Sequence, residues 1–326
     1  MGFKNFVGQG KYVELIKRGL KTGTINHAYL FYGPEGRGKL TLALILAQAL
    51  NCRNNPVDAC STCISCQKIA KGIHPDVAVI SPEGTRIKIE TIRKLKVSSS
   101  YRPYEGRKRI CIIKDADLLS LPAANSLLKI LEEPPSYLVF ILLTTNLNLM
   151  PHTIVSRCQH ISFKRVSAAE IYSFLEGQGY PYSSTELKTA ANLADGNIGH
   201  ALKILTSPDW KDKRERYLKM SKNCTSGFKG DIISSAEELA GEEDLMEFID
   251  FLESYLRDCL IYRGTGEEDL IINIDYLEEI KNSKYNSPDD LLRMIKEAKK
   301  FKEIIGLPLN KKLALESLLL KMKGVK

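Results

Sequence analysis

The stretch from Gly33 to Leu40 has the residue types and spacing of a phosphate-binding loop. It follows a short apolar run, expected to be a strand, and precedes a long apolar segment, expected to be a helix. In such a unit, backbone N–H groups and a lysine cradle the phosphates of a nucleotide at the helix N-terminus. The residues placed to do so here are Gly33, Gly36, Gly38 and Lys39.

The loop departs from the active pattern at its last position. A working loop of this kind ends in Ser or Thr, whose hydroxyl ligates Mg²⁺, and Leu40 supplies no oxygen. Thr41 stands one residue later, which turns its hydroxyl by about 100° around the helix. On this stretch alone, a weak enzyme and a protein that only holds ATP or ADP are both open.

Four of the eight cysteines are clustered directly after the expected helix, at Cys52, Cys60, Cys63 and Cys66. Two consecutive C-x-x-C steps bring three thiolates within reach of one ion, and Cys52 supplies a fourth. Four cysteine ligands with no open position are typical of structural zinc. The alternative is disulfides or unligated thiols, and a reducing cytosol disfavours disulfides. We therefore predict structural Zn²⁺ in an insertion over residues 52–66, which has almost no hydrophobic core of its own.

The expected strand at residues 110–113 tests whether the loop belongs to an ATPase. In P-loop ATPases this strand ends in an Asp that holds Mg²⁺, followed by a Glu that activates water. Aligned from the apolar run, those places hold Lys114 and Asp115, and a cation at the first would repel Mg²⁺. Shifting the alignment by one residue makes Asp115 the metal ligand but puts Ala116 in place of the base.

Arg157 lies in Ser156-Arg157-Cys158, just before the last expected strand. An arginine at the rim of an α/β core can be a surface residue, a packing partner or an arginine finger. The residues alone favour the surface.

Strands alternating with helices are expected to position these residues. Solid apolar runs predict strands over 27–32, 76–80, 109–113, 137–143 and 159–163, the second of them buried. Helical patterns cover 9–22, 40–50, 89–98 and 118–133. This alternation is typical of a parallel sheet covered on both faces, so residues 1–165 are predicted to form an α/β core.

The β pattern disappears from about residue 166 onward. Ser167 and Glu170 have the spacing of a capping box at a helix start. Further short helices are expected over 186–194 and 199–205. We predict a small helical lid domain over 166–207 and an all-α C-terminal domain over 208–326.

The length and net charge of the chain limit the number of its domains and the kind of partner it would bind. The 326 residues suit two or three domains. With 47 basic and 39 acidic residues the net charge is +8, which favours a polyanionic partner such as nucleic acid; solvated helix surface is the equal alternative. No run approaches the roughly 18 apolar residues of a membrane span, and Met1-Gly2-Phe3-Lys4 leads into polar sequence rather than the apolar run expected of a signal peptide. We expect a cytoplasmic protein with no membrane partner.

Several motifs carry a family resemblance. They are His27-Ala28-Tyr29-Leu30-Phe31 with the phosphate-binding loop, the four-cysteine insertion, Pro103-Tyr104-Glu105-Gly106, Ala123-Ala124-Asn125-Ser126-Leu127-Leu128-Lys129, Leu131-Glu132-Glu133-Pro134-Pro135 and Ser156-Arg157-Cys158-Gln159. With these motifs the sequence resembles the AAA+ clamp-loader subunits of bacterial DNA polymerase III, and most closely the delta prime subunits. The detailed similarity covers about residues 5–205.

The resemblance implies an AAA+ P-loop module of two domains joined to a helical collar domain for oligomerisation. It implies assembly with tau/gamma motor subunits and delta, in a holoenzyme component that loads the sliding clamp onto primer-template DNA during replication. It also implies that Arg157 acts in trans as an arginine finger in the neighbouring subunit's nucleotide site. Such fingers contribute on the order of 10³–10⁵ in rate in comparable nucleotidases. Gly199 stands where the motor relatives carry a lid arginine that contacts the γ-phosphate.

Leu40, Lys114 and Gly199 together predict that this chain does not hydrolyse ATP itself. One alternative is an active ATPase of the tau/gamma type with unusual motif residues. A further alternative, suggested by the charge, is a zinc-stabilised DNA-binding module.

Overall fold

The computed structural model describes residues 2–226, 242–283, 287–305 and 310–322. The chain divides into two compact units. The first contains Met1–Phe174 and Gly196–Gly199, and the second contains Leu175–Asp195 and His200–Lys326. The three-domain division expected from the sequence stays a prediction.

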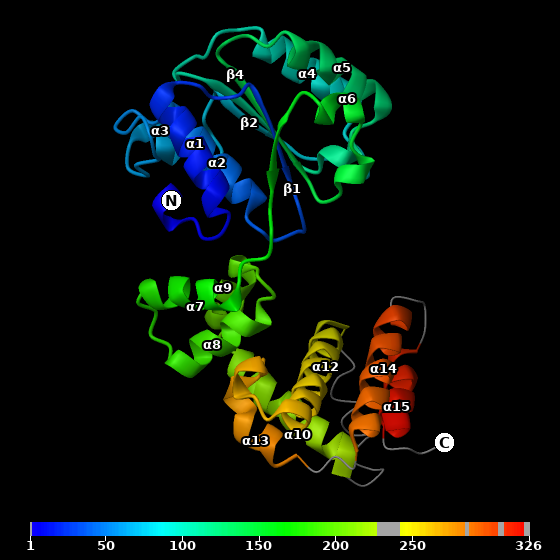
Figure 1. Cartoon of the computed structure of the whole chain (residues 1–326). Coiled ribbons are helices and arrows are strands. Elements are labelled where there is room, and N and C mark those ends of the chain that lie inside the picture. The colour runs from blue at the N-terminus through cyan, green and yellow to red at the C-terminus, as the bar shows by residue number, and fades with distance from the viewer. Residues whose placement is uncertain (1, 227–241, 284–286, 306–309, 323–326) are drawn as a thin grey trace. The chain divides into compact units, whose positions relative to one another are not determined.

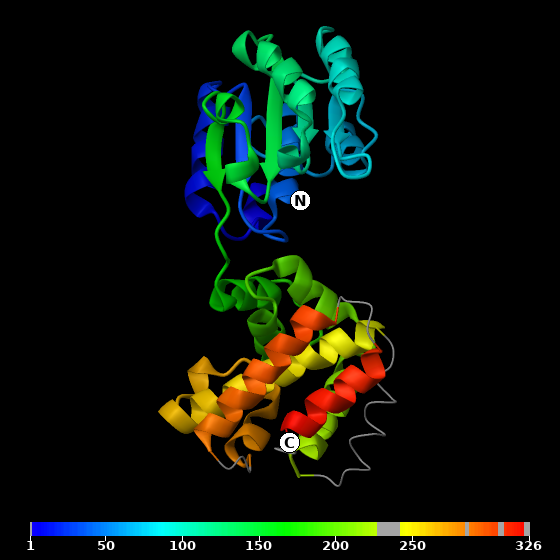
Figure 2. The same ribbon diagram turned by 90° about the vertical axis from the view of Figure 1, so that its right-hand side faces the viewer.

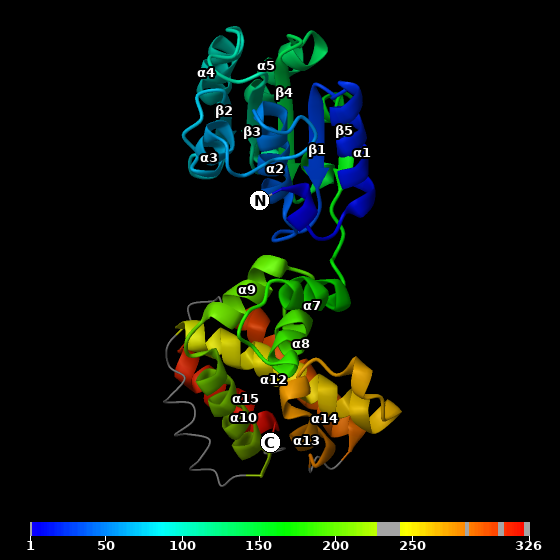
Figure 3. The same cartoon turned by 90° about the vertical axis from the view of Figure 1, so that its left-hand side faces the viewer.

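The first unit is built on a parallel sheet of five strands in the order β2-β3-β4-β1-β5. The strands are β1 (Ala28–Tyr32), β2 (Val77–Ile80), β3 (Arg109–Ile113), β4 (Leu138–Thr144) and β5 (Gln159–Ser162). Figure 3 shows them side by side in this order. Each lies within one residue of its predicted bounds, because continuous apolar runs are typical of strands in a sheet covered on both faces.

Helices cover both faces of this sheet. The first-unit helices are α1 (Gly10–Thr22), α2 (Lys39–Asn51), α3 (Ile64–Ala70), α4 (Ile89–Ser99), α5 (Leu121–Glu132) and α6 (His152–Val155). One core joins α1, α2 and α3 to Tyr29 and Phe31 of β1, and a second joins α4, α5 and α6 to Ala28 and Leu30. The two sets lie on opposite sides of the sheet in Figure 1. The predicted α/β class is confirmed.

Three details of the sequence prediction were wrong. Strand β2 is not buried: it lies at the edge of the sheet, and Ala78 and Val79 are exposed. The helix expected from Leu118 begins at Leu121, after a 3-10 turn over Ala116–Leu118. Helix α3 was not predicted, because its seven residues are too few for a clear helical period.

The second unit is helical. Its elements are α8 (Ser184–Leu193), α10 (Trp210–Ser226), α12 (Glu242–Thr265), η4 (Glu268–Leu270), η5 (Ile274–Tyr276), α13 (Leu277–Lys281), α14 (Pro288–Ile304) and α15 (Lys311–Met322). Helices α7 (Ala168–Gly177) and α9 (Ile198–Thr206) each contribute residues to both units. The buried apolar side chains of α12 pack with those of α10, α14 and α15 in one core. Figure 2 shows three of these helices, α12 in yellow, α14 in orange and α15 in red.

Side-chain capping contacts mark the starts of α7 and α8. Ser167 and Glu170 form the predicted capping contacts at the start of α7, with Glu170 N donating to Ser167 Oγ at 3.2 Å. A second capping box, between Ser183 and Glu186, starts α8 two residues before its expected first residue. No helix in the described residues is both long and apolar enough to cross a membrane.

Candidate phosphate-binding loop and metal centre

The phosphate-binding loop lies between β1 and α2, as predicted. Gly33, Gly36 and Gly38 all have positive φ angles, of 141°, 72° and 81°. Gly33 and Gly36 also have no room for a side chain. An added Cβ would overlap the Phe163 carbonyl at Gly33 and the Asn197 amide at Gly36. These positions therefore require glycine for both backbone and space.

Lys39 is held by the loop itself. Its Nζ donates to the carbonyl oxygens of Gly33 at 2.6 Å and Pro34 at 2.7 Å. Burial lowers the pKa of Lys39, and the nearby carboxylates of Glu35, Asp115 and others oppose that shift. The ammonium group is thus held at the first two residues of the loop, where a phosphate could replace the carbonyls as its partner.

Leu40 and the two carboxylates of Asp115 and Asp117 lie near Lys39 and decide whether Mg²⁺ could bind there. Leu40 packs partly buried against the core that contains α2. Asp115 and Asp117 lie close enough to act on the charge of Lys39. Asp117 also accepts a hydrogen bond from the buried Thr144 hydroxyl at the end of β4. The site therefore has carboxylates in its vicinity but an apolar side chain where the Mg²⁺-ligating hydroxyl belongs.

Residues 196–199 belong to the same compact unit as the loop. The Asn197 amide lies against Gly36, and Arg37 lies against Gly196. Arg37 is 8% exposed. The sequence did not single out Asn197. Its contact with Gly36 joins segments that are 161 positions apart along the chain. Gly199 lies in this segment without a side chain that could reach a phosphate.

The four clustered cysteines are brought together as expected. The Sγ atoms of Cys52, Cys60, Cys63 and Cys66 all lie within 4.8 Å of one another. Sulfur atoms bound to one tetrahedral zinc at 2.3 Å would be about 3.8 Å apart, so the geometry fits the ion with small adjustments. Both Cys52 and Cys66 are fully buried.

Backbone groups around the sulfurs favour the thiolate form. The Cys63 N–H donates to Cys60 Sγ at 3.3 Å, and the Cys66 N–H donates to Cys63 Sγ at 3.5 Å. Hydrogen bonds from the Thr62 side chain and the Cys63 backbone lower the pKa of Cys60 to about 6. Burial raises the pKa of Cys66, which a cation in the cluster would oppose. The cluster can therefore hold one metal ion.

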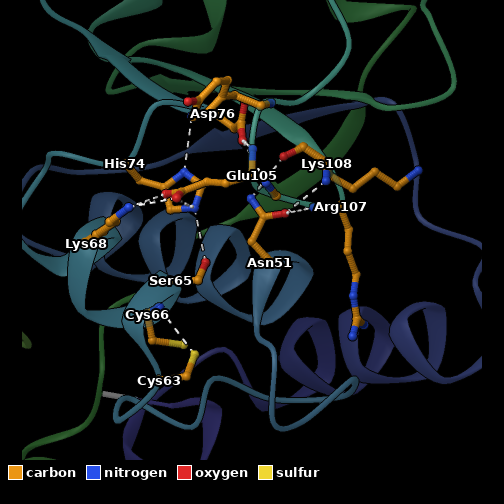
Figure 4. Close-up of polar contacts among 12 residues, drawn as sticks. Asn51, Cys63, Ser65, Cys66, Lys68, His74, Asp76, Glu105, Arg107 and Lys108 are labelled. Atoms are coloured by element: carbon orange, nitrogen blue, oxygen red, sulfur yellow. Dashed lines mark hydrogen bonds and ion pairs between the residues drawn. The ribbon is translucent and has the colours of Figure 1, made fainter.

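A polar network connects this cluster to the loop before β3 (Figure 4). The Asp76 carboxylate accepts N–H bonds from Tyr104 at 2.7 Å, Glu105 at 2.9 Å and Gly106 at 2.8 Å. Burial raises the pKa of Asp76, but these donors outweigh it and leave the pKa below its usual value. His74 Nδ1 accepts the Asp76 N–H at 3.1 Å, so its Nε2 carries the proton that faces Ser65.

Two further contacts anchor the same loop. Asn51, the last residue of α2, accepts N–H bonds from Arg107 and Lys108, both at 2.9 Å. The Glu105 carboxylate pairs with Lys68 of α3 at 2.7 Å. Sequence reasoning missed Asp76 and Asn51 because their partners are 28–57 residues away.

Arg157 lies between α6 and β5. Its Nη2 donates to Glu132 at the end of α5 at 2.6 Å, and its Nη1 donates to the Thr153 carbonyl at 2.9 Å. The side chain is 35% exposed. An exposed ion pair of this kind contributes about 0–1 kcal/mol, so a phosphate could displace Glu132. Within the described chain, the hydrogen bonds of Arg157 go to residues outside the phosphate-binding loop.

Comparison with known proteins identifies the family. The model described as "DNA polymerase III, delta subunit" matches residues 8–167, and the one described as "DNA polymerase III, delta subunit, C terminal" matches residues 208–324. The chain belongs to the DNA polymerase III clamp-loader subunit family.

Relatives within the family carry different subunit names. The chain is 38% identical over 208 residues to DNA polymerase III subunit gamma of Buchnera aphidicola, covering 62% of this chain and 57% of that protein. It is 31% identical to subunit tau of Bacillus subtilis, covering 80% and 50%. It is 32% identical to subunit delta' of Bacillus subtilis, covering 65% and 64%. The matched region thus spans about half to two thirds of each of these relatives.

Two solved structures that match the chain have low sequence identity and TM-scores below 0.5. A DNA polymerase III gamma subunit-related protein from Thermotoga maritima has a TM-score of 0.44 and 18% identity, covering 96% of this chain and 98% of that chain. The Bacillus subtilis DNA clamp loader delta protein has a TM-score of 0.37 and 12% identity, covering 96% and 99%.

Proposed function

We propose that this chain is a delta prime-like clamp-loader subunit that does not hydrolyse ATP itself. It would assemble with tau/gamma-type motor subunits and delta in the bacterial cytoplasm. The assembly would load a sliding clamp onto primer-template DNA during replication. The finding that carries the proposal is Leu40, whose side chain packs on the core of α2 at the position of the Mg²⁺ ligand.

Other features support the loss of hydrolysis. Lys114 stands where the metal-binding carboxylate is expected, and Gly199 offers no side chain to a γ-phosphate. The loop keeps its glycine conformations and Lys39, so weak binding of ATP or ADP is part of the proposal. Nucleotide binding requires only the backbone N–H groups and the lysine of the loop, whereas hydrolysis also requires Mg²⁺ and its ligands.

Arg157 supplies the proposed contribution to ATP chemistry. Its partly exposed guanidinium is held by Glu132 and by a backbone carbonyl, so the side chain is ordered before any neighbour binds. In the assembly the γ-phosphate bound by a motor subunit would replace Glu132 as its partner. Arginine is suited to this exchange because its planar fork matches both carboxylate and phosphate.

We also propose that the four-cysteine cluster binds one structural Zn²⁺. The support is the convergence of four sulfurs on one point and the N–H groups that favour their thiolate forms. Four protein ligands would leave no open position, so the ion would stabilise the insertion and take no part in a reaction.

ATP hydrolysis tests the proposal. The purified chain should show no steady hydrolysis. In an assembly reconstituted with a motor subunit that has a complete loop, Arg157→Ala should reduce DNA-stimulated turnover and clamp loading. Arg18→Ala, which removes another exposed arginine from α1, is the matched control and should leave both unchanged. Equal turnover in the Arg157→Ala and Arg18→Ala assemblies would exclude the finger.

An active tau/gamma-type ATPase is the second candidate. It is favoured by the carboxylates of Asp115 and Asp117 near Lys39, which could recruit Mg²⁺ in place of the missing hydroxyl. This candidate requires hydrolysis by the isolated chain that is lost in Lys39→Ala. The same measurement therefore separates the two functions.

A further inference from the structure

The segment Gly2–Gln9 precedes α1 and is attached at its start to the cysteine insertion, residues 52–66. The Phe3 N–H donates to Asp58 Oδ1 at 2.8 Å. A Cβ added at Gly2 would lie 2.9 Å from that carboxylate and 2.8 Å from the Ala59 carbonyl oxygen, so the backbone packs directly on the insertion there. Phe3 is also buried in the core that contains α2. The start of segment 2–9 is therefore held by the insertion and by the core together.

Asp58 is placed by a turn that begins at a cysteine. The Asn55 N–H donates to Cys52 Sγ at 3.3 Å. The side-chain oxygen of Asn55 then accepts N–H bonds from Val57 at 2.9 Å and from Asp58 at 3.2 Å. The Asp58 carboxylate in turn accepts the Phe3 N–H. A continuous series of hydrogen bonds thus runs from a cysteine sulfur to the backbone of segment 2–9.

The cysteines also form the interior of the insertion. Its buried core consists of Cys52, Ala59 and Cys66, with Cys60 and Cys63 packed against it. Cys52 and Cys60 enclose the turn that carries Asp58, and one ion bound to both would close that turn into a loop. Small units with so little apolar core depend on their metal for folding. Loss of the ion is therefore expected to release the turn and, with it, the contact of Asp58 with Phe3.

Segment 2–9 is attached a second time at its far end, by residues that follow β5. Gln9 Nε2 donates to the Lys164 carbonyl at 2.9 Å. A Cβ added at Gly8 would lie 2.7 Å from Cγ2 of Val166, so the chain passes close to that side chain. The two attachments use different parts of the first unit. The contact with the insertion can therefore be released while the contact beyond β5 is kept.

Between its two attachments, segment 2–9 lies against the phosphate-binding loop. A Cβ added at Gly38 would lie 3.1 Å from Cε2 of the Phe6 ring. Gly38 is the N-cap of α2, and its carbonyl accepts the Leu42 N–H at 2.9 Å. Figures 1 and 3 both show the start of the chain near α2. The Phe6 ring thus packs at the helix start, the part of such a loop to which phosphates bind.

We propose that the cysteine insertion positions segment 2–9 against the phosphate-binding loop, so that gain or loss of metal also changes the start of α2. Asn55 and Asp58 are the positioning residues, and Phe6 is the side chain that reaches the loop. The proposal rests on the metal site proposed above. It gives that site an effect on a loop, Gly33 to Leu40, that contains none of the four cysteines.

Helix α2 is a second physical connection between the cluster and the loop, because Cys52 follows its last residue. The test therefore breaks the path through Asp58 while the metal stays bound. Hydrogen exchange of the full chain, resolved to single amides, reports each part. The Phe3 amide reports the attachment to the insertion, and the Leu42 amide reports the start of α2. The Val13 amide, which donates to the Gln9 carbonyl at 3.1 Å, reports the far end.

Asp58→Ala removes the acceptor and leaves the four cysteines in place. The variant should keep its zinc by metal analysis, while exchange at Phe3 becomes about 10- to 150-fold faster, the factor for loss of one hydrogen bond to a charged group. Leu42 should also exchange faster, by a smaller factor, and Val13 should keep its rate. Asp58→Asn retains a side-chain oxygen that can accept the same bond and should restore slow exchange. Glu83→Ala, which removes an exposed carboxylate elsewhere in the first unit, is the matched control and should change none of these rates.

Removal of zinc with a chelator is the second part of the test. In the wild type it should accelerate exchange at both Phe3 and Leu42. In Asp58→Ala it should add little at Phe3, because that variant has already lost the contact that the metal maintains. Two changes that act through one contact are not additive, so this comparison shows whether the metal acts on segment 2–9 through Asp58.

Three results would overturn the proposal. The first is wild-type exchange at Phe3 that does not change when zinc is removed. The second is Asp58→Ala with faster exchange at Phe3 but an unchanged rate at Leu42, which would show that segment 2–9 has no effect on the loop. The third is loss of zinc from Asp58→Ala, which would make Asp58 part of the metal site itself. Native protein without zinc is a different failure, because metal analysis alone then refutes the metal site and, with it, any dependence of the loop on metal.

Discussion

Replacing Asp76 with alanine should release the loop before β3. The carboxylate is 1% exposed and accepts three backbone N–H bonds, from consecutive residues Tyr104, Glu105 and Gly106. Hydrogen bonds to a charged group contribute about 1.5–3 kcal/mol each. The simple sum overstates the loss, because the opened loop can be rehydrated and the desolvation of the carboxylate is recovered. We expect a loss of about 3–5 kcal/mol, at or below the low end of the sum of about 4.5–9 kcal/mol for three such bonds.

Hydrogen exchange measures this loss at the atoms concerned. The amides of Tyr104, Glu105 and Gly106 should exchange much faster in Asp76→Ala, and the most protected amides of β3 should report the reduced free energy of unfolding of the first unit. Tryptophan fluorescence would not serve, because the single tryptophan lies in the second unit. Glu83→Ala removes an exposed carboxylate and should change stability by less than about 0.5 kcal/mol.

The pH dependence gives an independent check on Asp76. Its pKa lies below the usual value in the folded protein, so its contribution to stability is present above the unfolded-state pKa of about 3.9 and is lost as the pH falls through the folded-state pKa. The difference in stability between the wild type and Asp76→Ala should therefore shrink below about pH 4. The reasoning is refuted if Asp76→Ala and Glu83→Ala have the same stability and the three amides keep their protection.

Three further predictions concern other parts of the chain. Cys63→Ser should reduce bound zinc from about one ion per chain to none, as measured by metal analysis, and native protein without zinc would exclude the site. Ser183→Ala removes a capping box and should cost the second unit about 1 kcal/mol, measured by urea unfolding with Trp210 fluorescence; an unchanged midpoint would contradict the capping contribution. Leu40→Thr should not start ATP hydrolysis, because Lys114 remains at the expected Mg²⁺ position, and steady phosphate release would show that Leu40 alone silences the site.

The sequence was sufficient for features that depend on neighbouring residues. Continuous apolar runs predicted all five strands, and the cysteine spacing predicted the cluster that the structure brings together. The prediction that β2 is buried failed, because apolar composition does not reveal whether a strand has neighbours on both sides. Position in the sheet is a property of the whole topology.

The missed site residues have partners that are distant in sequence. Asp76 and Asn51 look like ordinary polar residues at the ends of elements, and only the fold brings them to the loop before β3. The pairing of Glu132 with Arg157 spans 25 residues and joins two motifs that the family resemblance had already singled out separately. A motif identifies such residues, but it does not specify which of them touch.

Helix α2 connects the phosphate-binding loop, the cysteine cluster and the loop before β3. It begins at Lys39 and ends at Asn51, which binds the backbone of Arg107 and Lys108. Cys52 follows directly, and Gln48 donates to the carbonyl of Cys66 at 2.9 Å. The cysteine cluster therefore joins the end of α2 to the start of α3, and Lys68 of α3 holds Glu105. A metal ion held by the four cysteines would in this way help to shape the loop before β3, because two of the loop's anchors, Asn51 and Lys68, lie on the two helices that the cluster joins.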